Sequence, residues 1–261
     1  MKHRPRKRFG QNFLVDSSVI DRIVDAISPQ PGDHLVEVGP GQGALTRQLA
    51  GSGAQLTLIE IDRDLSAALA ADPALSEVRL INADVLKVNW QDLARGRPIR
   101  LVGNLPYNIS TPLLFHALAS ADLITDMHFM LQQEVVQRMA APPGSKAFGR
   151  LSVMLQYRCR VESLFRVPPG AFRPVPKVDS AVVRLRPRSA DQCQARNEAL
   201  LDQVVSAAFA QRRKTLRNSL RSLLSADQIT QLDIDPSARP ETLEVTDFVT
   251  LADALADQSP D

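Results

Sequence analysis

Short apolar runs alternate with stretches of helical apolar spacing over the first part of the chain. The runs are typical of buried strands and are expected at residues 35–38, 56–60, 78–82, 99–103, 126–131 and 178–185. Helices are expected to begin at Asp16 or Ser17, near Leu45, at Asp62 or Arg63, at Thr111 and at Gln132. Strands that alternate with helices predict a parallel sheet of the α/β class.

The pattern changes near residue 186, where a polar segment with Pro187 follows the last expected strand. We expect a linker at residues 186–196. From Asn197 onward the apolar residues recur at helical spacing only, as at Leu201, Val204 and Val205. The sequence therefore predicts an α/β domain at residues 1–188, which includes an N-terminal arm, and a small all-helical C-terminal domain at residues 189–261.

Three glycines at alternate positions follow the first expected strand, at Gly39, Gly41 and Gly43. Glycine allows a positive φ angle and close approach of the backbone, so the loop can lie against a nucleoside cofactor. Glu60 ends the next expected strand, 21 residues after Gly39. A carboxylate at that position can bind both hydroxyls of a ribose.

The glycine loop alone does not decide which cofactor binds. Gly39, Gly41 and Ala44 also satisfy the fingerprint of dinucleotide-binding dehydrogenases, in which alanine can replace the last glycine. Two features favour S-adenosylmethionine instead. Glu37 stands two residues before Gly39, where a methyltransferase orients the methionine end of the cofactor, and the motif Asn104-Leu-Pro-Tyr107 follows a later expected strand.

Polar residues and a glycine stand at the ends of four expected strands, namely Gly39, Glu60, Asp84 and Asn104. Parallel strands end at one edge of a sheet, and ligands bind beyond their carboxyl ends. We therefore expect these four residues around one site. Asp84 is expected to contact the adenine amine of the cofactor, and the alternative is that it caps a helix.

The motif Asn104-Leu-Pro-Tyr107 suits methyl transfer to an exocyclic base amine. Such an amine is a poor nucleophile, because its lone pair is delocalised into the ring. The Asn104 side-chain oxygen and a main-chain carbonyl near Leu105 or Pro106 can accept its two hydrogens and favour a pyramidal nitrogen. Tyr107 can stack on a base that has left its own stack, a contact worth about 1–3 kcal/mol. The alternative is an ordinary turn after a strand.

Composition narrows the choice of partner. The 261 residues are 44% hydrophobic but hold no run of about 18 apolar residues, so no membrane span is expected. Two cysteines, Cys159 and Cys193, give no disulfide framework or metal cluster and fit reduced thiols in a cytoplasmic protein. The net charge is +2, yet residues 157–221 hold 14 Lys or Arg against 5 Asp or Glu. This basic segment favours binding to nucleic acid.

With these residues in place, the chain closely resembles the small-subunit ribosomal RNA adenine dimethyltransferases. The similarity spans nearly the whole chain, in the segments Lys7–Leu14, Glu37–Thr46, Asn104–Asn108, Phe172–Val183 and Phe209–Leu220. It implies a Rossmann-like methyltransferase sheet followed by a small helical domain that binds RNA or the ribosome. It also implies S-adenosylmethionine as the cofactor and N6,N6-dimethylation of two adjacent adenosines near the 3′ end of 16S rRNA.

The resemblance implies roles for further residues. Asn12 and Leu14 of the N-terminal arm would contact the cofactor beside Gly39, Glu60, Asp84 and Asn104. The loop Phe172–Pro176 would lie beside the target base, and Phe172 would sandwich this base opposite Tyr107. The cations expected to face RNA or to position the helical domain are Arg212, Arg213, Lys214 and Arg217. A salt-bridged helix face is the alternative for this cluster.

Two other functions share part of these motifs. A large-subunit rRNA adenine methyltransferase of the antibiotic-resistance type shares the glycine loop and Asn104-Leu-Pro-Tyr107, but the matches at 172–183 and 209–220 argue against it. A ribosome assembly factor without catalysis is the second alternative, and the intact motifs argue against loss of activity. We expect a monomer in the cytoplasm that acts in ribosome biogenesis, without a metal ion.

Overall fold

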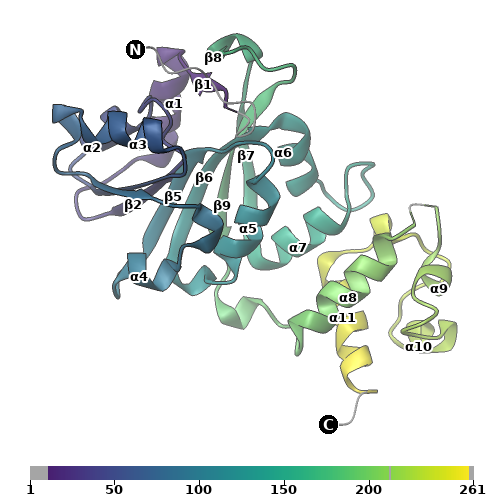
Figure 1. Cartoon of the computed structure of the whole chain (residues 1–261). Coiled ribbons are helices and arrows are strands. Elements are labelled where there is room, and N and C mark those ends of the chain that lie inside the picture. Colours follow the sequence, from purple (N-terminus) through teal and green to yellow (C-terminus); the bar gives the residue numbers. More distant parts are fainter. Residues whose placement is uncertain (1–10, 212, 259–261) are drawn as a thin grey trace. The chain divides into compact units, whose positions relative to one another are not determined.

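The computed structural model describes residues 11–211 and 213–258, and the structural statements below refer to these residues. Strands and helices follow one another along most of the chain, and helices alone form its C-terminal part (Figure 1).

The strands are β1 Phe13–Leu14, β2 His34–Val38, β3 Gln55–Glu60, β4 Arg79–Asn82, β5 Ile99–Asn104, β6 Ile124–Gln132, β7 Cys159–Val167, β8 Phe172–Arg173 and β9 Ser180–Pro187. The α-helices are α1 Ser17–Ile27, α2 Thr46–Ala50, α3 Arg63–Ala70, α4 Trp90–Ala94, α5 Ser110–Leu118, α6 Gln133–Met139, α7 Arg150–Arg158, α8 Glu198–Phe209, α9 Leu216–Ser219, α10 Ala226–Gln231 and α11 Val245–Ala256. None of the described helices has the length and apolar content to cross a membrane.

Seven strands form one sheet in the order β4-β3-β2-β5-β6-β9-β7. The first five in this order are parallel to one another, and β9 pairs antiparallel with β6. The chain runs from β2 to β3 on one side and later reaches β5 on the other, so the strand order reverses between β2 and β5. Ligands of α/β sheets bind at such a reversal, beyond the carboxyl ends of the strands. The predicted fold class is confirmed.

The local sequence explains the first elements of the sheet unit. All five residues of β2 are buried, as expected for a strand that is covered on both faces. Helix α1 is amphipathic, and its buried residues are Val19, Ile20, Ile23 and Ile27. The Asp16 carboxylate caps this helix, because it accepts hydrogen bonds from the main-chain N–H groups of Ser18 and Val19. The predicted start of α1 is found in the structure.

The chain forms two compact units, Met1–Val136 with Glu162–Pro187 and Gln137–Val161 with Arg188–Asp261. The predicted division at residue 188 is therefore wrong for residues 137–161, which belong to the helical unit. The cause is helix α7, whose Val153 and Tyr157 are buried in the same core as Leu201 of α8 and Phe248 of α11. An apolar helical face in the sequence does not specify which core it joins.

The N-terminal arm contributes a short strand to the sheet unit. Strand β1 pairs antiparallel with β8, so that Phe13 faces Arg173 and Leu14 faces Phe172. The main-chain N–H of Val15 also donates to the carbonyl of Ala171 over 2.9 Å. Two residues are too few to produce a strand periodicity in the sequence. This pairing holds the arm beside the segment at 171–173.

Candidate active site

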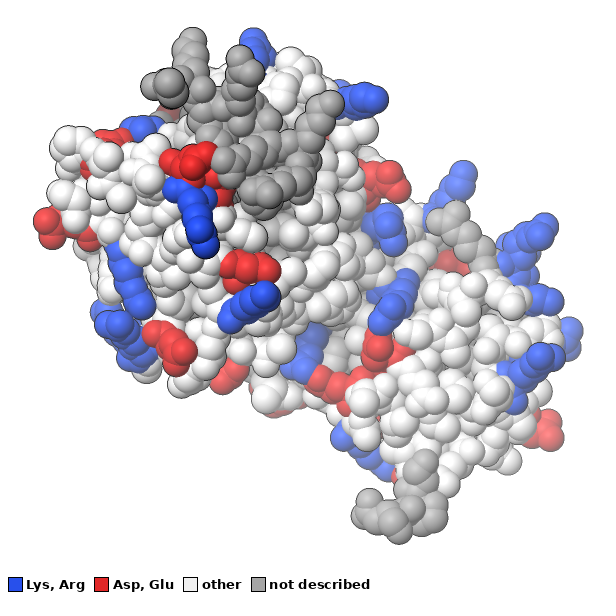
Figure 2. Space-filling view, viewed as in Figure 1, with Lys and Arg blue, Asp and Glu red and all other residues white. Residues whose placement is uncertain are grey.

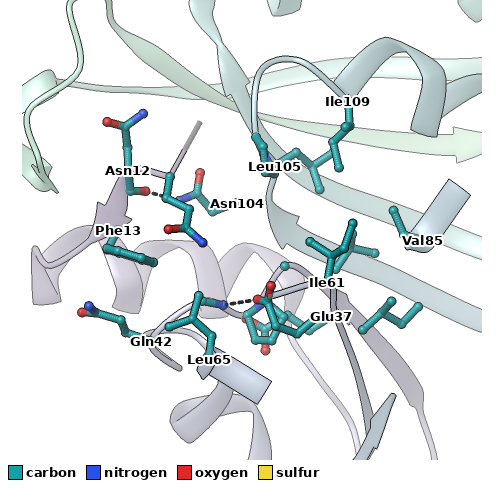
Figure 3. Close-up of a pocket in the computed structure, with 18 of the residues that line it drawn as sticks. Asn12, Phe13, Glu37, Gln42, Ile61, Leu65, Val85, Asn104, Leu105 and Ile109 are labelled. Atoms are coloured by element: carbon teal, nitrogen blue, oxygen red, sulfur yellow. Dashed lines mark hydrogen bonds between the residues drawn. The ribbon is translucent and has the colours of Figure 1, made fainter. Parts of the chain in front are cut away.

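A cavity of about 330 Å³ lies at the carboxyl ends of β2, β3 and β5 (Figure 3). Its lining comes from the arm, the glycine loop, the end of β3 and the turns after β4 and β5. The residues expected at the strand ends all line it, namely Gly39, Glu60, Asp84 and Asn104. Further lining residues are the expected Asn12, Leu14, Glu37 and Gly41. The part of the chain that the structure describes holds no cluster of His, Cys, Asp and Glu suited to a metal ion.

The arm and the glycine loop approach each other closely at Gly41. This residue has a φ angle of 59°, in the left-handed region that favours glycine. A Cβ atom at Gly41 would lie 3.1 Å from the ring of Phe13. A side chain at Gly41 would therefore strain the backbone and press on the Phe13 ring. Phe13 lines the cavity, although the sequence pattern had not identified it as a site residue.

Glu60 connects the end of β3 to the glycine loop. Its Oε2 accepts a hydrogen bond from the Gly41 main-chain N–H over 3.1 Å, and its Oε1 accepts one from the Asp62 N–H over 2.8 Å. Burial raises the pKa of the Glu60 carboxyl, and these two hydrogen bonds oppose the shift. A carboxylate held in this way at the cavity wall can accept further hydrogen bonds from ribose hydroxyls.

Glu37 lies deeper, in β2, and only 2% of its surface is exposed. The Thr46 hydroxyl donates to Glu37 Oε2 over 2.7 Å. Burial raises the pKa of the Glu37 carboxyl to about 7, the Thr46 hydrogen bond opposes this shift, and the nearby Glu60 adds to it. A positively charged ligand in the cavity would compensate the charge of this carboxylate.

Asp84 caps a helix, as one of its two interpretations predicts, and it also lines the cavity. Its Oδ1 accepts a hydrogen bond from the Leu86 main-chain N–H over 3.1 Å and thereby caps a short 3-10 helix, Val85–Lys87. The same residue lines the cavity, next to Val85 and Leu86. The cap fixes the carboxyl group at the cavity wall. Its second oxygen can meet an amine there.

Asn104 ends β5 and is held by the arm. Its side-chain Nδ2 donates a hydrogen bond to the Asn12 main-chain carbonyl over 3.0 Å (Figure 3). Because this contact engages the amino group of the amide, Oδ1 is the atom that can accept a hydrogen from a substrate amine. The turn that follows is fixed by the Leu105 N–H, which donates to the Met130 carbonyl, and by the Ile109 N–H, which donates to the Pro106 carbonyl.

Phe172 does not lie where the resemblance placed it. Only 1% of its surface is exposed, and its side chain belongs to the core of the sheet unit together with Leu14 and Val182. It does not line the cavity. In this structure the ring of Phe172 is therefore not exposed to sandwich a base opposite Tyr107. The pairing of β1 with β8 turns the ring of Phe172 into the core, where an aromatic side chain loses most contact with water.

The expected cations of the helical unit are on its surface. Arg213, Lys214 and Arg217 are exposed, and Arg212 lies outside the described residues. Arg239 is also exposed, although it is the only basic residue in an acidic stretch of sequence. The Leu216 N–H donates to the Ala238 carbonyl, which brings Arg239 beside α9. Lys and Arg side chains gather on the visible face of this unit (Figure 2).

Comparisons with known proteins agree along the whole chain. The family model for ribosomal RNA adenine dimethylases matches residues 2–257. The ribosomal RNA small subunit methyltransferase A of Pseudomonas putida is 57% identical over 98% of this chain and 97% of its own length. The protein of the same name from Xanthomonas campestris is 57% identical over 95% of both chains.

Two solved structures share the fold over most of their length. A dimethyladenosine transferase from Plasmodium falciparum has a TM-score of 0.79 at 24% identity and covers 92% of this chain and 95% of its own. The 23S rRNA methyltransferase ErmE has a TM-score of 0.73 at 27% identity and covers 94% of this chain and all of its own. The family model and the close relatives decide the assignment: this chain belongs to the ribosomal RNA adenine dimethylase family.

Proposed function

We propose that this protein transfers methyl groups from S-adenosylmethionine to the N6 amines of two adjacent adenosines near the 3′ end of 16S rRNA in the small ribosomal subunit. The products are N6,N6-dimethyladenosines, and the role is in ribosome biogenesis. The observation that carries the proposal is Asn104-Leu-Pro-Tyr107 at the wall of a cavity that also holds Glu60 and Asp84. The close relatives named small subunit methyltransferase A support this choice of RNA.

The cavity residues suit S-adenosylmethionine. Glu60 would accept hydrogen bonds from the two ribose hydroxyls, and Asp84 would accept one from the adenine amine. Glu37 would lie toward the methionine end, where its buried carboxylate compensates positive charge. Asn12 and Leu14 would close the site from the arm. When bound, the cofactor supplies a methyl group already activated by a sulfonium charge.

Activation of the target amine would fall to Asn104 and its turn. Asn104 Oδ1 and a main-chain carbonyl at Leu105 or Pro106 would accept the two amine hydrogens and free the nitrogen lone pair. These acceptors would direct the lone pair in line toward the methyl group that the cofactor supplies, and the nitrogen would lose a proton to solvent after the transfer. Positioning and electrostatics therefore account for catalysis, and a strong general base is not required. Tyr107 would stack on the base.

RNA binding would rest on the exposed cations of the helical unit. Arg213, Lys214 and Arg217 would neutralise phosphates, and Arg212 would extend the same basic segment. Arg239 would add a further cation, which is not evident from the sequence because the residues around it are acidic. We propose that the protein acts as a monomer in the cytoplasm, where small ribosomal subunits are assembled.

Methylation of large-subunit RNA is a second candidate function, because ErmE shares the fold over the full length of its chain. Labelled S-adenosylmethionine should therefore be offered with three substrates: unmethylated small subunits, naked 16S rRNA and 23S rRNA. We expect dimethyladenosine at two adjacent positions near the 3′ end of 16S rRNA. Label in 23S rRNA would assign the resistance type, and particle binding without label would assign an assembly factor.

The Asn104→Ala variant provides the matched control for that assay. It should lose nearly all methyl transfer while S-adenosylmethionine binding largely survives, because the substitution removes an acceptor of the target amine. Normal methylation by this variant would contradict the proposed activation of the amine.

A further inference from the structure

The hydroxyl of Tyr107 is held by a residue that the proposed chemistry does not use. Tyr107 Oη and Ser180 Oγ lie 3.1 Å apart, and either atom can be the donor. Tyr107 lines the cavity and is partly exposed, whereas only 1% of Ser180 is exposed. The two residues are 73 positions apart in the sequence. The sheet brings them together, because Asn104 ends β5 and Ser180 begins β9, and both strands pair with β6.

Ser180 is held in place by the pairing of β9 with β6 and by contacts of its neighbour Asp179. It pairs with Gln132 in the antiparallel ladder of β9 and β6. The preceding residue, Asp179, accepts a hydrogen bond from the Gln133 main-chain N–H over 3.0 Å. The Asp179 carboxylate also accepts two hydrogen bonds from Arg166, each of 2.9 Å. The strand start at Ser180 is therefore braced from β6 and β7.

Tyr107 is held at its other end by its own turn. The Ser110 hydroxyl donates to the Tyr107 main-chain carbonyl over 3.0 Å. A tyrosine side chain has two rotatable bonds, and its hydroxyl oxygen lies on the axis of the second, so a fixed backbone and a fixed hydroxyl together determine the direction of the ring axis. A phenylalanine here would keep the stacking surface but would lose the second point of attachment.

We propose that Ser180 is a positioning residue for Tyr107, which fixes the place of the ring on which the target base stacks and thereby the place of its amine relative to Asn104. This inference rests on the proposed function, because it concerns the target base of that reaction. In-line transfer depends on placement, and a small misplacement of the reacting atoms lowers the rate. Ser180 does not touch the reacting atoms, so its effect passes through Tyr107.

The test is a double-mutant cycle of Ser180→Ala and Tyr107→Phe. Its readout is the single-turnover rate of methyl transfer to 16S rRNA in unmethylated small subunits, with enzyme and cofactor in saturating excess over the RNA. Either substitution removes the same neutral hydrogen bond, so each should lower the rate by about two- to tenfold. The double variant should be no slower than the slower single variant, because the residues act through one contact. The Kd of S-adenosylmethionine should remain within about twofold of the wild-type value.

Thr57→Val is the matched control. Thr57 is fully buried in β3, its hydroxyl lies 3.1 Å from His34 Nε2, and it does not line the cavity. Loss of this hydroxyl should lower stability without changing the single-turnover rate. The control therefore separates the loss of a buried hydrogen bond from the loss of ring placement.

The outcomes separate this inference from the proposed function. If the wild-type protein methylates 16S rRNA and Ser180→Ala matches its rate, the inference is wrong and the proposed function stands. Rate losses of the two single variants that multiply in the double variant would also overturn it, because they would show independent roles. A wild-type protein that methylates none of the three substrates would overturn the proposed function itself.

Discussion

Replacing Glu37 by glutamine should stabilise the cofactor-free protein above pH 7 and change its stability little at pH 5. Burial raises the pKa of the Glu37 carboxyl from 4.5 to about 7. Between pH 4.5 and about pH 7 the Glu37 carboxyl keeps its proton in the folded protein, whereas the same carboxyl has released it in the unfolded chain. Stability therefore falls as the pH rises through this window, and above pH 7 the folded protein bears the full cost of a buried charge.

The size of the effect follows from the same two pKa values. Their difference corresponds to about 3 kcal/mol in the free energy of unfolding. Glutamine has nearly the same volume, and its carbonyl oxygen can accept the hydrogen bond that the Thr46 hydroxyl now donates to Glu37 Oε2. The substitution thus removes the charge while it keeps the packing and the hydrogen bond.

Urea unfolding of the cofactor-free wild-type and Glu37→Gln proteins at pH 5 and pH 8 would measure this effect. We expect the variant to be more stable by about 3 kcal/mol at pH 8 and by about 1 kcal/mol or less at pH 5. Glu77→Gln is a suitable control, because it makes the same substitution at an exposed carboxyl. A Glu37→Gln variant that is less stable at pH 8, or equally shifted at both pH values, would refute the reasoning.

Three further predictions concern the cavity, the basic surface and the sheet. Glu60→Ala should raise the Kd of S-adenosylmethionine about ten- to a hundredfold in calorimetry, and an unchanged Kd would remove Glu60 from the site. Replacing the exposed Arg213, Lys214 and Arg217 together by glutamine should weaken the salt dependence of RNA binding. The slope of the logarithm of the binding constant against the logarithm of the salt concentration should fall in magnitude by about 2. An unaltered slope would assign a structural role to these three cations. Asp126→Asn should cost about 1.5–3 kcal/mol in urea unfolding, because it removes the carboxylate charge that binds the largely buried Arg100, which keeps its pair with Asp33. A loss below about 1 kcal/mol would contradict this estimate.

The position of the cavity could be predicted because it depends on local patterns. Each apolar run predicted a strand, and the end of the run showed which residue stands at the carboxyl end of that strand. Parallel pairing brings those ends to one edge, which is why Gly39, Glu60 and Asn104 meet around one cavity. The positions follow from strand periodicity and topology, without any knowledge of side-chain contacts.

The fate of a buried side chain could not be predicted in the same way. The sequence of α7 shows apolar helical positions, but these positions fit either of two cores. Phe172 stands in a motif expected beside the target base, yet the pairing of β8 with β1 turns it into the core. Both outcomes depend on contacts between segments far apart in the chain. Apolar periodicity reports only the local secondary structure and contains no information on such contacts.

The orientation of the reactive side chains depends on such distant contacts even where their identity is evident. The motif at 104–107 supplies an amide and an aromatic ring, but neither has a defined direction within the motif. The Asn12 carbonyl engages Asn104 Nδ2, and the Ser180 hydroxyl engages the Tyr107 hydroxyl. The arm and the start of β9 therefore turn a common strand-end motif into a site with one acceptor direction and one position for the stacking ring. Substitutions in these two segments should alter catalysis while every residue of the motif itself stays in place.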